Sequence, residues 1–260
     1  MKLFSFRNLR VAILLGVLLL VLNYTLGQRL HSTTWSDPLE VVIYPLNADG
    51  KPATAAYIRA LNQRRLEPIA IFFRREAHRW GVVEPDPIRV ELGATVDAPL
   101  PPEPGGSLLS RLLWSLKIRY WAWRHTPDTA SNFQRIRVFV LYQQGSDGKP
   151  LAHSLGLQKG LLGIVNAYAL TSQTRQNNIV IAHEIMHTVG AMDRYDQNGD
   201  PVYPEGYAEP ERKPLYPQRR AAIMAGRIAV AAGQSRMPRS LKSCLVKKIT
   251  AREIGWLRDE

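Results

Sequence analysis

The motif His183-Glu-Ile-Met-His187 constrains this chain more than any other feature, because its side chains can act together only on a helix. At about 3.6 residues per turn, His183 and His187 project from one face of a helix, one turn apart, so their imidazoles can share a metal ion. The neighbouring residues have the apolar periodicity of a buried helix. We expect this helix over about residues 178–189, with Asn177 or Asn178 as its N-cap.

The motif also has the composition of a catalytic zinc site. Zinc accepts two neutral imidazoles and one oxygen ligand and keeps a fourth position for water. A bound zinc ion lowers the pKa of that water from about 15.7 to near 7. Glu184 follows the first histidine and can accept a proton from the water without binding the metal. The alternative is that both histidines are ordinary core residues of a buried helix.

Residues 183–193, with the sequence HEIMHTVGAMD, resemble the zinc-binding motif of the metzincin metallopeptidases, in the snapalysin-like variant that ends in Asp. The resemblance implies three zinc ligands: His183, His187 and Asp193. It further implies that Glu184 is the general base and that Gly190 turns the chain back towards the metal. Met224 is the best match to the methionine turn of the family, and Met237 is the alternative. The resemblance covers residues 155–226 and implies a zincin-like fold with a mixed twisted sheet, an active-site helix and an irregular C-terminal subdomain.

A different class of zincins takes its third ligand from a glutamate on a second helix downstream. The candidates for such a ligand are Glu205, Glu209 and Glu211. Five prolines between residues 201 and 217 disfavour the helix that this glutamate would need. We therefore favour Asp193, whose nearest rivals are Asp196 and Asp200.

Strands and helices alternate along the rest of the chain, which predicts one α/β (α+β) domain over residues 39–260. We expect strands at residues 39–46, 88–92, 135–142, 155–157 and 161–167. We expect further helices at residues 52–81, 107–125, 221–232 and 250–257, with an irregular stretch at 193–217. The strand at 155–157 can lie at the sheet edge and pair with an extended peptide.

Residues 1–27 contain an apolar run, Val11 to Leu22, that follows three basic residues and no acidic one. This pattern predicts an N-terminal transmembrane helix that acts as a signal anchor, or a signal peptide cleaved near Gln28. A buried core helix is the third interpretation. Residues 28–38 are expected to form a polar connector. The basic flank predicts that the catalytic domain lies outside the cytoplasm, membrane-anchored, or secreted or periplasmic after cleavage.

The net charge of +12 predicts anionic surroundings. Between Lys213 and Arg252 there are ten Lys and Arg residues and no Asp or Glu, so this basic C-terminal region can bind an anionic envelope surface or can simply be solvated. No nucleic-acid-binding motif is present, and we expect no nucleic acid partner. The segment 107–125 mixes Trp and Tyr with Lys and Arg, which fits a membrane-interface helix or a helix packed on the sheet. The single cysteine, Cys244, excludes an internal disulfide and a cysteine-based zinc site.

These patterns together predict a zinc-dependent metalloendopeptidase that acts on protein or peptide substrates outside the cytoplasm. One alternative is a non-catalytic zincin-like envelope module, in which zinc holds the fold and the basic surface binds anionic partners. Another alternative is a zinc amidase that acts on cell-wall material. Glu184 favours a catalytic role, because a structural zinc site needs no base beside its ligands.

Overall fold

Five strands form a mixed, mainly parallel sheet in the order β2-β1-β3-β5-β4. The computed structural model describes residues 6–102, 104–126, 135–145, 154–157 and 161–257. The parallel strands are β1 (Leu39–Asn47), β2 (Ile88–Leu92), β3 (Arg135–Gln143) and β5 (Leu162–Tyr168). At one edge of the sheet, β4 (Leu155–Leu157) pairs with β5 in the antiparallel direction. The expected α/β architecture with a mixed sheet is confirmed.

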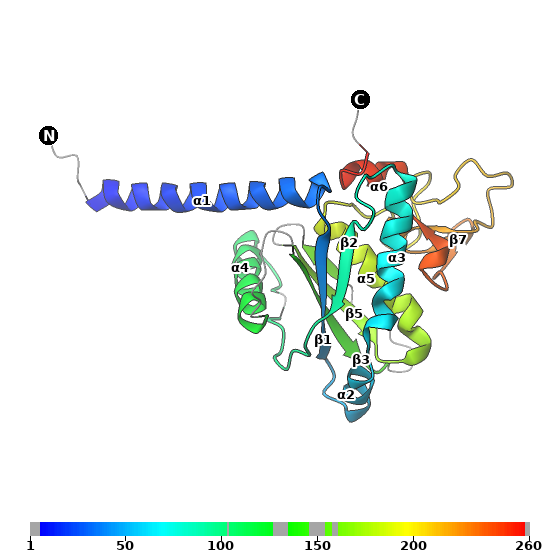
Figure 1. Ribbon diagram of the computed structural model, residues 1–260, viewed down its shortest axis with the longest axis horizontal. Coiled ribbons are helices and arrows are strands. Elements are labelled where there is room, and N and C mark those ends of the chain that lie inside the picture. The colour runs from blue at the N-terminus through cyan, green and yellow to red at the C-terminus, as the bar shows by residue number, and fades with distance from the viewer. Residues whose placement is uncertain (1–5, 103, 127–134, 146–153, 158–160, 258–260) are drawn as a thin grey trace.

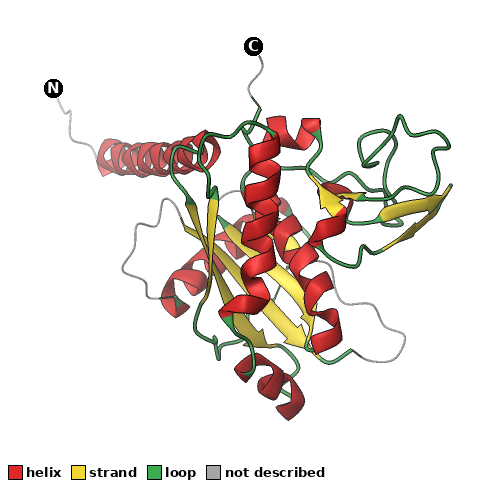
Figure 2. Ribbon diagram, turned by 45° about the vertical axis from the view of Figure 1, so that its right-hand side comes forward, coloured by secondary structure: helices red, strands yellow, loops and turns green. Residues whose placement is uncertain are grey.

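Helices cover both faces of this sheet (Figures 1 and 2). One face packs against α2 (Pro52–Arg59), α3 (Gln63–Arg79) and α5 (Thr174–Thr188), and the other packs against α4 (Leu108–His125). The β3 side chains alternate accordingly: Val138 and Val140 face the α3–α5 side, and Phe139 faces α4. Burial on both faces explains why the central strands β1, β3 and β5 are largely apolar, whereas the edge strand β2 alternates between buried and exposed residues.

Helix α5, which contains His183 and His187, begins at Thr174, so the prediction that Asn177 or Asn178 is its N-cap is wrong. Both asparagines are buried inside the helix and bind neighbouring elements instead. Asn177 donates its Nδ2 to the carbonyl oxygen of Tyr168 in β5 at 2.9 Å. Asn178 donates its Nδ2 to the carbonyl oxygen of Arg65 in α3 at 2.8 Å. These two amides fasten α5 to the sheet and to its neighbouring helix.

Two predicted helices are replaced by shorter elements. The helix expected over 52–81 breaks between α2 and α3, where Gln63 Oε1 accepts a hydrogen bond from the backbone N–H of Leu92 at 3.0 Å. The helix expected over 221–232 is absent, because Gly226 has a φ of +67° and interrupts the segment. The remaining elements are η1 (Thr171–Gln173), β6 (Ala221–Ala222), η2 (Ile223–Ala225), β7 (Ile228–Ala231), β8 (Gln234–Arg236), η3 (Leu241–Ser243), β9 (Cys244–Leu245) and α6 (Lys248–Glu253).

The N-terminal segment forms one helix, α1 (Phe6–Thr34), which extends away from the rest of the molecule (Figure 1). Its uninterrupted apolar run, Val11 to Leu22, is about 18 Å long at 1.5 Å per residue, whereas a bilayer core is about 30 Å thick. Over the ranges that the structure describes, no helix has both the length and the apolar character that crossing a membrane requires. The predicted N-terminal transmembrane helix is therefore wrong. The helix also continues into the segment expected to be a connector.

The C-terminal end of α1 is fastened to the C-terminal end of the domain. Trp35 is 5% exposed, donates its indole N–H to the carbonyl oxygen of Ile254 at 2.6 Å, and meets the ring of Trp256 edge to face. Gly255 has a φ of +78°, and a Cβ there would lie only 2.3 Å from the carbonyl oxygen of Thr33. Glycine is therefore needed for this close approach.

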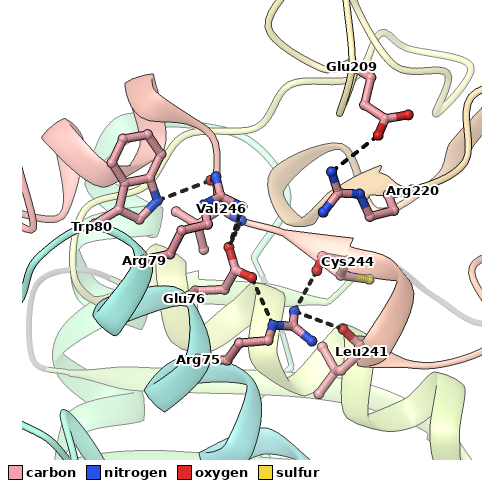
Figure 3. A network of polar contacts seen from close by, with 9 residues as sticks. All are labelled: Arg75, Glu76, Arg79, Trp80, Glu209, Arg220, Leu241, Cys244 and Val246. Carbon is pink, nitrogen blue, oxygen red and sulfur yellow. Dashed lines mark hydrogen bonds and ion pairs between the residues drawn. The ribbon is translucent and has the colours of Figure 1, made fainter.

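A buried carboxylate joins α3 to the C-terminal subdomain, which is the part of the chain that follows α5 and contains β6 to α6 (Figure 3). Glu76 is 3% exposed and accepts hydrogen bonds from Arg75 Nε at 3.0 Å, Arg79 Nη1 at 2.9 Å and the backbone N–H of Val246 at 2.8 Å. The same arginines donate to backbone carbonyls: Arg75 Nη2 to Cys244 at 2.7 Å, and Arg79 Nη2 to Val246 at 2.6 Å. Each charge therefore has partners, as a buried charged network requires.

Candidate metal centre

Three potential metal ligands converge at the C-terminal half of α5. His187 Nε2 lies 3.0 Å from His183 Nε2 and 3.0 Å from Asp193 Oδ1, and His183 Nε2 lies 3.1 Å from Asp193 Oδ1. Helical spacing aligns the two imidazoles. Gly190 directs the chain back with a φ of +112°, which brings the carboxylate to them. The structure thus brings together the three residues that the sequence proposed as ligands.

Backbone carbonyls fix the protonation of both imidazoles. His183 Nδ1 lies 2.9 Å from the carbonyl oxygen of Ile223, and His187 Nδ1 lies 2.8 Å from that of Ala191. A carbonyl oxygen can only accept, so each Nδ1 carries the hydrogen, and in the neutral rings each Nε2 presents a lone pair. With both rings neutral, two Nε2 lone pairs and a carboxylate oxygen meet at one point, and either a proton or a metal cation between them would relieve their repulsion.

The size and donor set of this site fit zinc. Ligand atoms about 2.0–2.1 Å from a tetrahedral ion lie about 3.3 Å from one another. The three donor atoms, at 3.0–3.1 Å, need to separate by only a few tenths of an ångström. Imidazole with carboxylate is also a donor set that zinc accepts. The hydrogen bonds of both Nδ1 atoms to carbonyls provide the outer support that metal-binding histidines usually have.

Glu184 lies beside the cluster and is 4% exposed. Its Oε2 atom is buried and has no hydrogen-bond partner among the described residues. Burial raises the pKa of its carboxyl above the usual value, an effect that the nearby charges of His183 and His187 oppose. A buried carboxylate with an unpaired oxygen and a raised pKa is suited to accept and release a proton.

The charge states of Asp193 and His187 depend on each other. Burial alone would raise the pKa of Asp193, but hydrogen bonds from His183 and His187 hold it well below the usual range. Burial alone would lower the pKa of His187, but the hydrogen bond and charge of Asp193 raise it. Without a metal, these opposite shifts keep Asp193 ionised and favour a proton on the neighbouring imidazole.

Three of the rival carboxylates, Asp196, Glu205 and Glu209, have other partners. Asp196 Oδ1 accepts the backbone N–H groups of Asn198 at 2.9 Å and Asp200 at 3.0 Å, which closes an ordinary turn. Glu205 lies 3.6 Å from Arg194, and Glu209 lies 3.1 Å from Arg220. None of the rival carboxylates belongs to the cluster of potential metal ligands in the described part of the chain.

Met224 lies in η2 and is fully buried. The carbonyl oxygen of Ile223, directly before it, accepts the hydrogen bond of His183. Its own carbonyl oxygen accepts the backbone N–H of Arg194 at 2.9 Å. The turn therefore supports the site from below through its backbone. Met237 lies elsewhere, on the lining of the adjacent cavity.

A cavity of about 610 Å³ opens beside the cluster, and His183 and Glu184 are part of its lining. Tyr195 and Arg227 also line it, and sequence analysis identified neither. The ring of Tyr195 lies 6.1 Å from that of His183. Burial and the charge and hydrogen bond of Asp193 raise the pKa of Tyr195 to about 12, so its hydroxyl stays protonated at neutral pH. No local sequence signal marks either residue, because the fold alone brings them to the cavity.

Comparisons with known proteins do not identify a family. No family model and no curated protein matches this chain. A crystal structure of wild type OgpA from Akkermansia muciniphila is similar at 9% sequence identity and a TM-score of 0.40. The match covers 84% of this chain and 60% of that chain, which is less than two thirds of its length. A similarity this weak establishes neither a shared fold nor a function.

Proposed function

We propose that this protein is a zinc-dependent peptidase. One observation carries the proposal: three donor atoms that suit zinc meet within 3.1 Å beside a buried glutamate whose Oε2 has no partner in the described structure. His183, His187 and Asp193 would hold the ion. When bound, zinc supplies a water of lowered pKa and a Lewis acid for a substrate carbonyl.

Two side chains of the cavity carry the remaining chemistry. Glu184 accepts the proton of the attacking water and delivers it to the nitrogen of the leaving amine. The Tyr195 hydroxyl is protonated at neutral pH and lines the same cavity. It is therefore available to donate a hydrogen bond to the carbonyl oxygen on which negative charge develops.

The sheet edge next to the site suits an extended substrate. β4 is the edge strand of the described sheet, and Ser154, directly before it, lines the cavity. A peptide can add to such an edge through backbone hydrogen bonds, with alternate side chains directed into neighbouring pockets. Most of the polar lining of the cavity is uncharged, and the lining includes Asn166, Gln173, Gln176 and Asn177.

Zinc analysis and digestion of a peptide library by the full-length protein test the proposal. We expect about one zinc per chain and cleavage of peptide bonds. Glu184→Gln keeps the shape of the side chain but removes its basicity, so this variant should retain zinc and fold while losing nearly all turnover. Equal turnover in wild type and Glu184→Gln would contradict the mechanism.

The alternatives predict different outcomes of the same experiment. A non-catalytic envelope module would bind zinc and cleave nothing, with or without Glu184. An amidase would leave the peptide library intact and release fragments from cell-wall material. Location outside the cytoplasm remains a separate prediction from the N-terminal sequence. It is tested by fusing to Glu260 a reporter that is active only outside the cytoplasm.

A further inference from the structure

Helix α4 has one face on the sheet and another in solvent. Ile118, Trp121 and Ala122 are buried against the sheet, and the ring of Trp121 lies 5.0 Å from that of Phe139 in β3. Ser107 caps the start of the helix by accepting the backbone N–H of Ser110 at 3.3 Å. These contacts set which face of the helix meets the sheet and therefore which face points outward.

The outer face of α4 is an apolar stripe. Six large side chains project from it, and each is 55–64% exposed: Leu109, Leu112, Leu113, Leu116, Tyr120 and Trp123. At 3.6 residues per turn, these six positions fall within about 100° of the helix circumference. The inner residues fall on the opposite side. Among the described residues the stripe therefore remains exposed while the opposite face of the helix packs on the sheet, and a continuous exposed patch of this kind marks an interaction site.

The charges beside this stripe are all positive. Lys117 and Arg124 are exposed and follow one border of the stripe, and Arg119 lies on the other. Residues 104–126 contain no Asp or Glu. Leucines on one side, Lys and Arg at the borders, and Trp and Tyr between them are the composition of a helix that lies in a lipid headgroup region. The two aromatic rings, 5.9 Å apart, favour the interface because each has an apolar body and a polar group.

We propose that α4 docks on the surface of an anionic lipid bilayer, parallel to the membrane plane, with its leucine stripe inserted among the headgroups. The stripe supplies apolar burial, and Lys117 and Arg124 attract the anionic lipid. A bilayer suits this surface better than a protein groove does, because the charge is of one sign along the whole helix. This attachment needs no helix that crosses the membrane.

Vesicle flotation with the full-length protein tests this docking. We expect binding to vesicles of phosphatidylcholine with phosphatidylglycerol, weaker binding in high salt, and little binding to phosphatidylcholine alone. Leu112→Ser with Leu116→Ser should weaken binding by at least about tenfold, because each leucine loses apolar burial. Lys117→Gln with Arg124→Gln should weaken it by about 25-fold, at about fivefold for each basic residue near the surface. Thermal unfolding checks that these variants remain folded.

Helix α1 provides the matched control, because it also exposes leucines, with Leu14 at 60% and Leu15 at 54%. We expect the Leu14→Ser, Leu15→Ser variant to bind anionic vesicles more tightly than the α4 variants do. Adding the α4 substitutions to this variant should weaken its binding by the same factor as in the wild-type background. The proposal is overturned if the α4 variants float like wild type while the α1 variant does not. It is also overturned if the wild-type protein ignores anionic vesicles and the α4 leucines instead hold two copies of the chain together.

Discussion

Replacing Glu76 by glutamine tests how the C-terminal subdomain is attached to α3. The Glu76 carboxylate is 3% exposed and accepts three hydrogen bonds, two from guanidinium groups and one from the backbone N–H of Val246. Glutamine has nearly the same volume but one acceptor oxygen instead of two. Its amide N–H₂ must then face a donor, and the positive charge of Arg75 and Arg79 loses its counter-charge.

The size of the effect follows from these contacts. A hydrogen bond to a charged group contributes about 1.5–3 kcal/mol to stability, and glutamine loses at least one of the three. The side chains of Arg75 and Arg79 are each 41% exposed, so water recovers part of the loss. We therefore expect the free energy of unfolding to fall by about 1–3 kcal/mol. For a chain of this size, the melting temperature then falls by about 2–12 °C.

Asp86→Asn is the matched control. Asp86 pairs with Arg74 at 2.6 Å, but the two side chains are 47% and 56% exposed. A surface pair of this kind contributes about 0.5 kcal/mol and is screened by salt. Thermal unfolding of both variants, at low and high salt, compares the two sites. Equal shifts in melting temperature, or a Glu76→Gln effect that vanishes in high salt, would refute the structural role assigned to Glu76.

Three further predictions concern the site and its surroundings. Asp193→Ala should weaken zinc binding by more than about a hundredfold, because losing only a residue that hydrogen-bonds to a metal ligand already costs up to that much. Asp196→Ala should leave zinc affinity unchanged. Equilibrium zinc titration of both variants measures the difference. Met224→Leu should retain zinc and activity and lose less than about 1.5 kcal/mol of stability, because the volume is nearly conserved; loss of zinc from the folded variant would contradict this. Burial raises the pKa of the Cys244 thiol to about 12. A thiol reagent should therefore label the native protein at least about a thousandfold more slowly than the unfolded protein. Rapid labelling of the native protein would show instead that the thiol is accessible.

The sequence predicted the elements whose environment can be inferred from their own residues. The apolar runs of β1 and β3 indicate strands buried on both faces, and the structure buries them between α4 and the α3–α5 layer. The relation of His183 to His187 was also predictable, because a helix places residues four apart on one face. Gly190 similarly indicated where the chain turns back after α5.

The features that sequence analysis missed depend on residues far apart in the chain. Asparagine is a favoured N-cap residue, but the side-chain amide of Asn178 instead donates a hydrogen bond to the carbonyl oxygen of Arg65, 113 positions away. Residues 221–232 are apolar enough for a helix, but they form the turn that supports His183 and a short strand. Tyr195 and Arg227 become part of the cavity only when the C-terminal subdomain folds beside α5. Local periodicity contains no information about such contacts.

If the protein is the proposed peptidase and α4 lies on a bilayer, the placement of α4 and α5 on opposite faces of the sheet would limit which membrane-bound substrates the site can reach. Successive layers of helix and sheet lie about 10 Å apart, so the axis of α5 lies about 20 Å beyond that of α4. With a bilayer against α4, a membrane-bound substrate must extend at least this far before its scissile bond meets Glu184. An extended chain covers about 3.3 Å per residue, so about six residues must separate that bond from the lipid surface. The sheet would then act as a fixed spacer. Membrane proteins with only a few residues between the bilayer and the cleavable bond would not be cleaved, whereas those with longer exposed segments would reach the site.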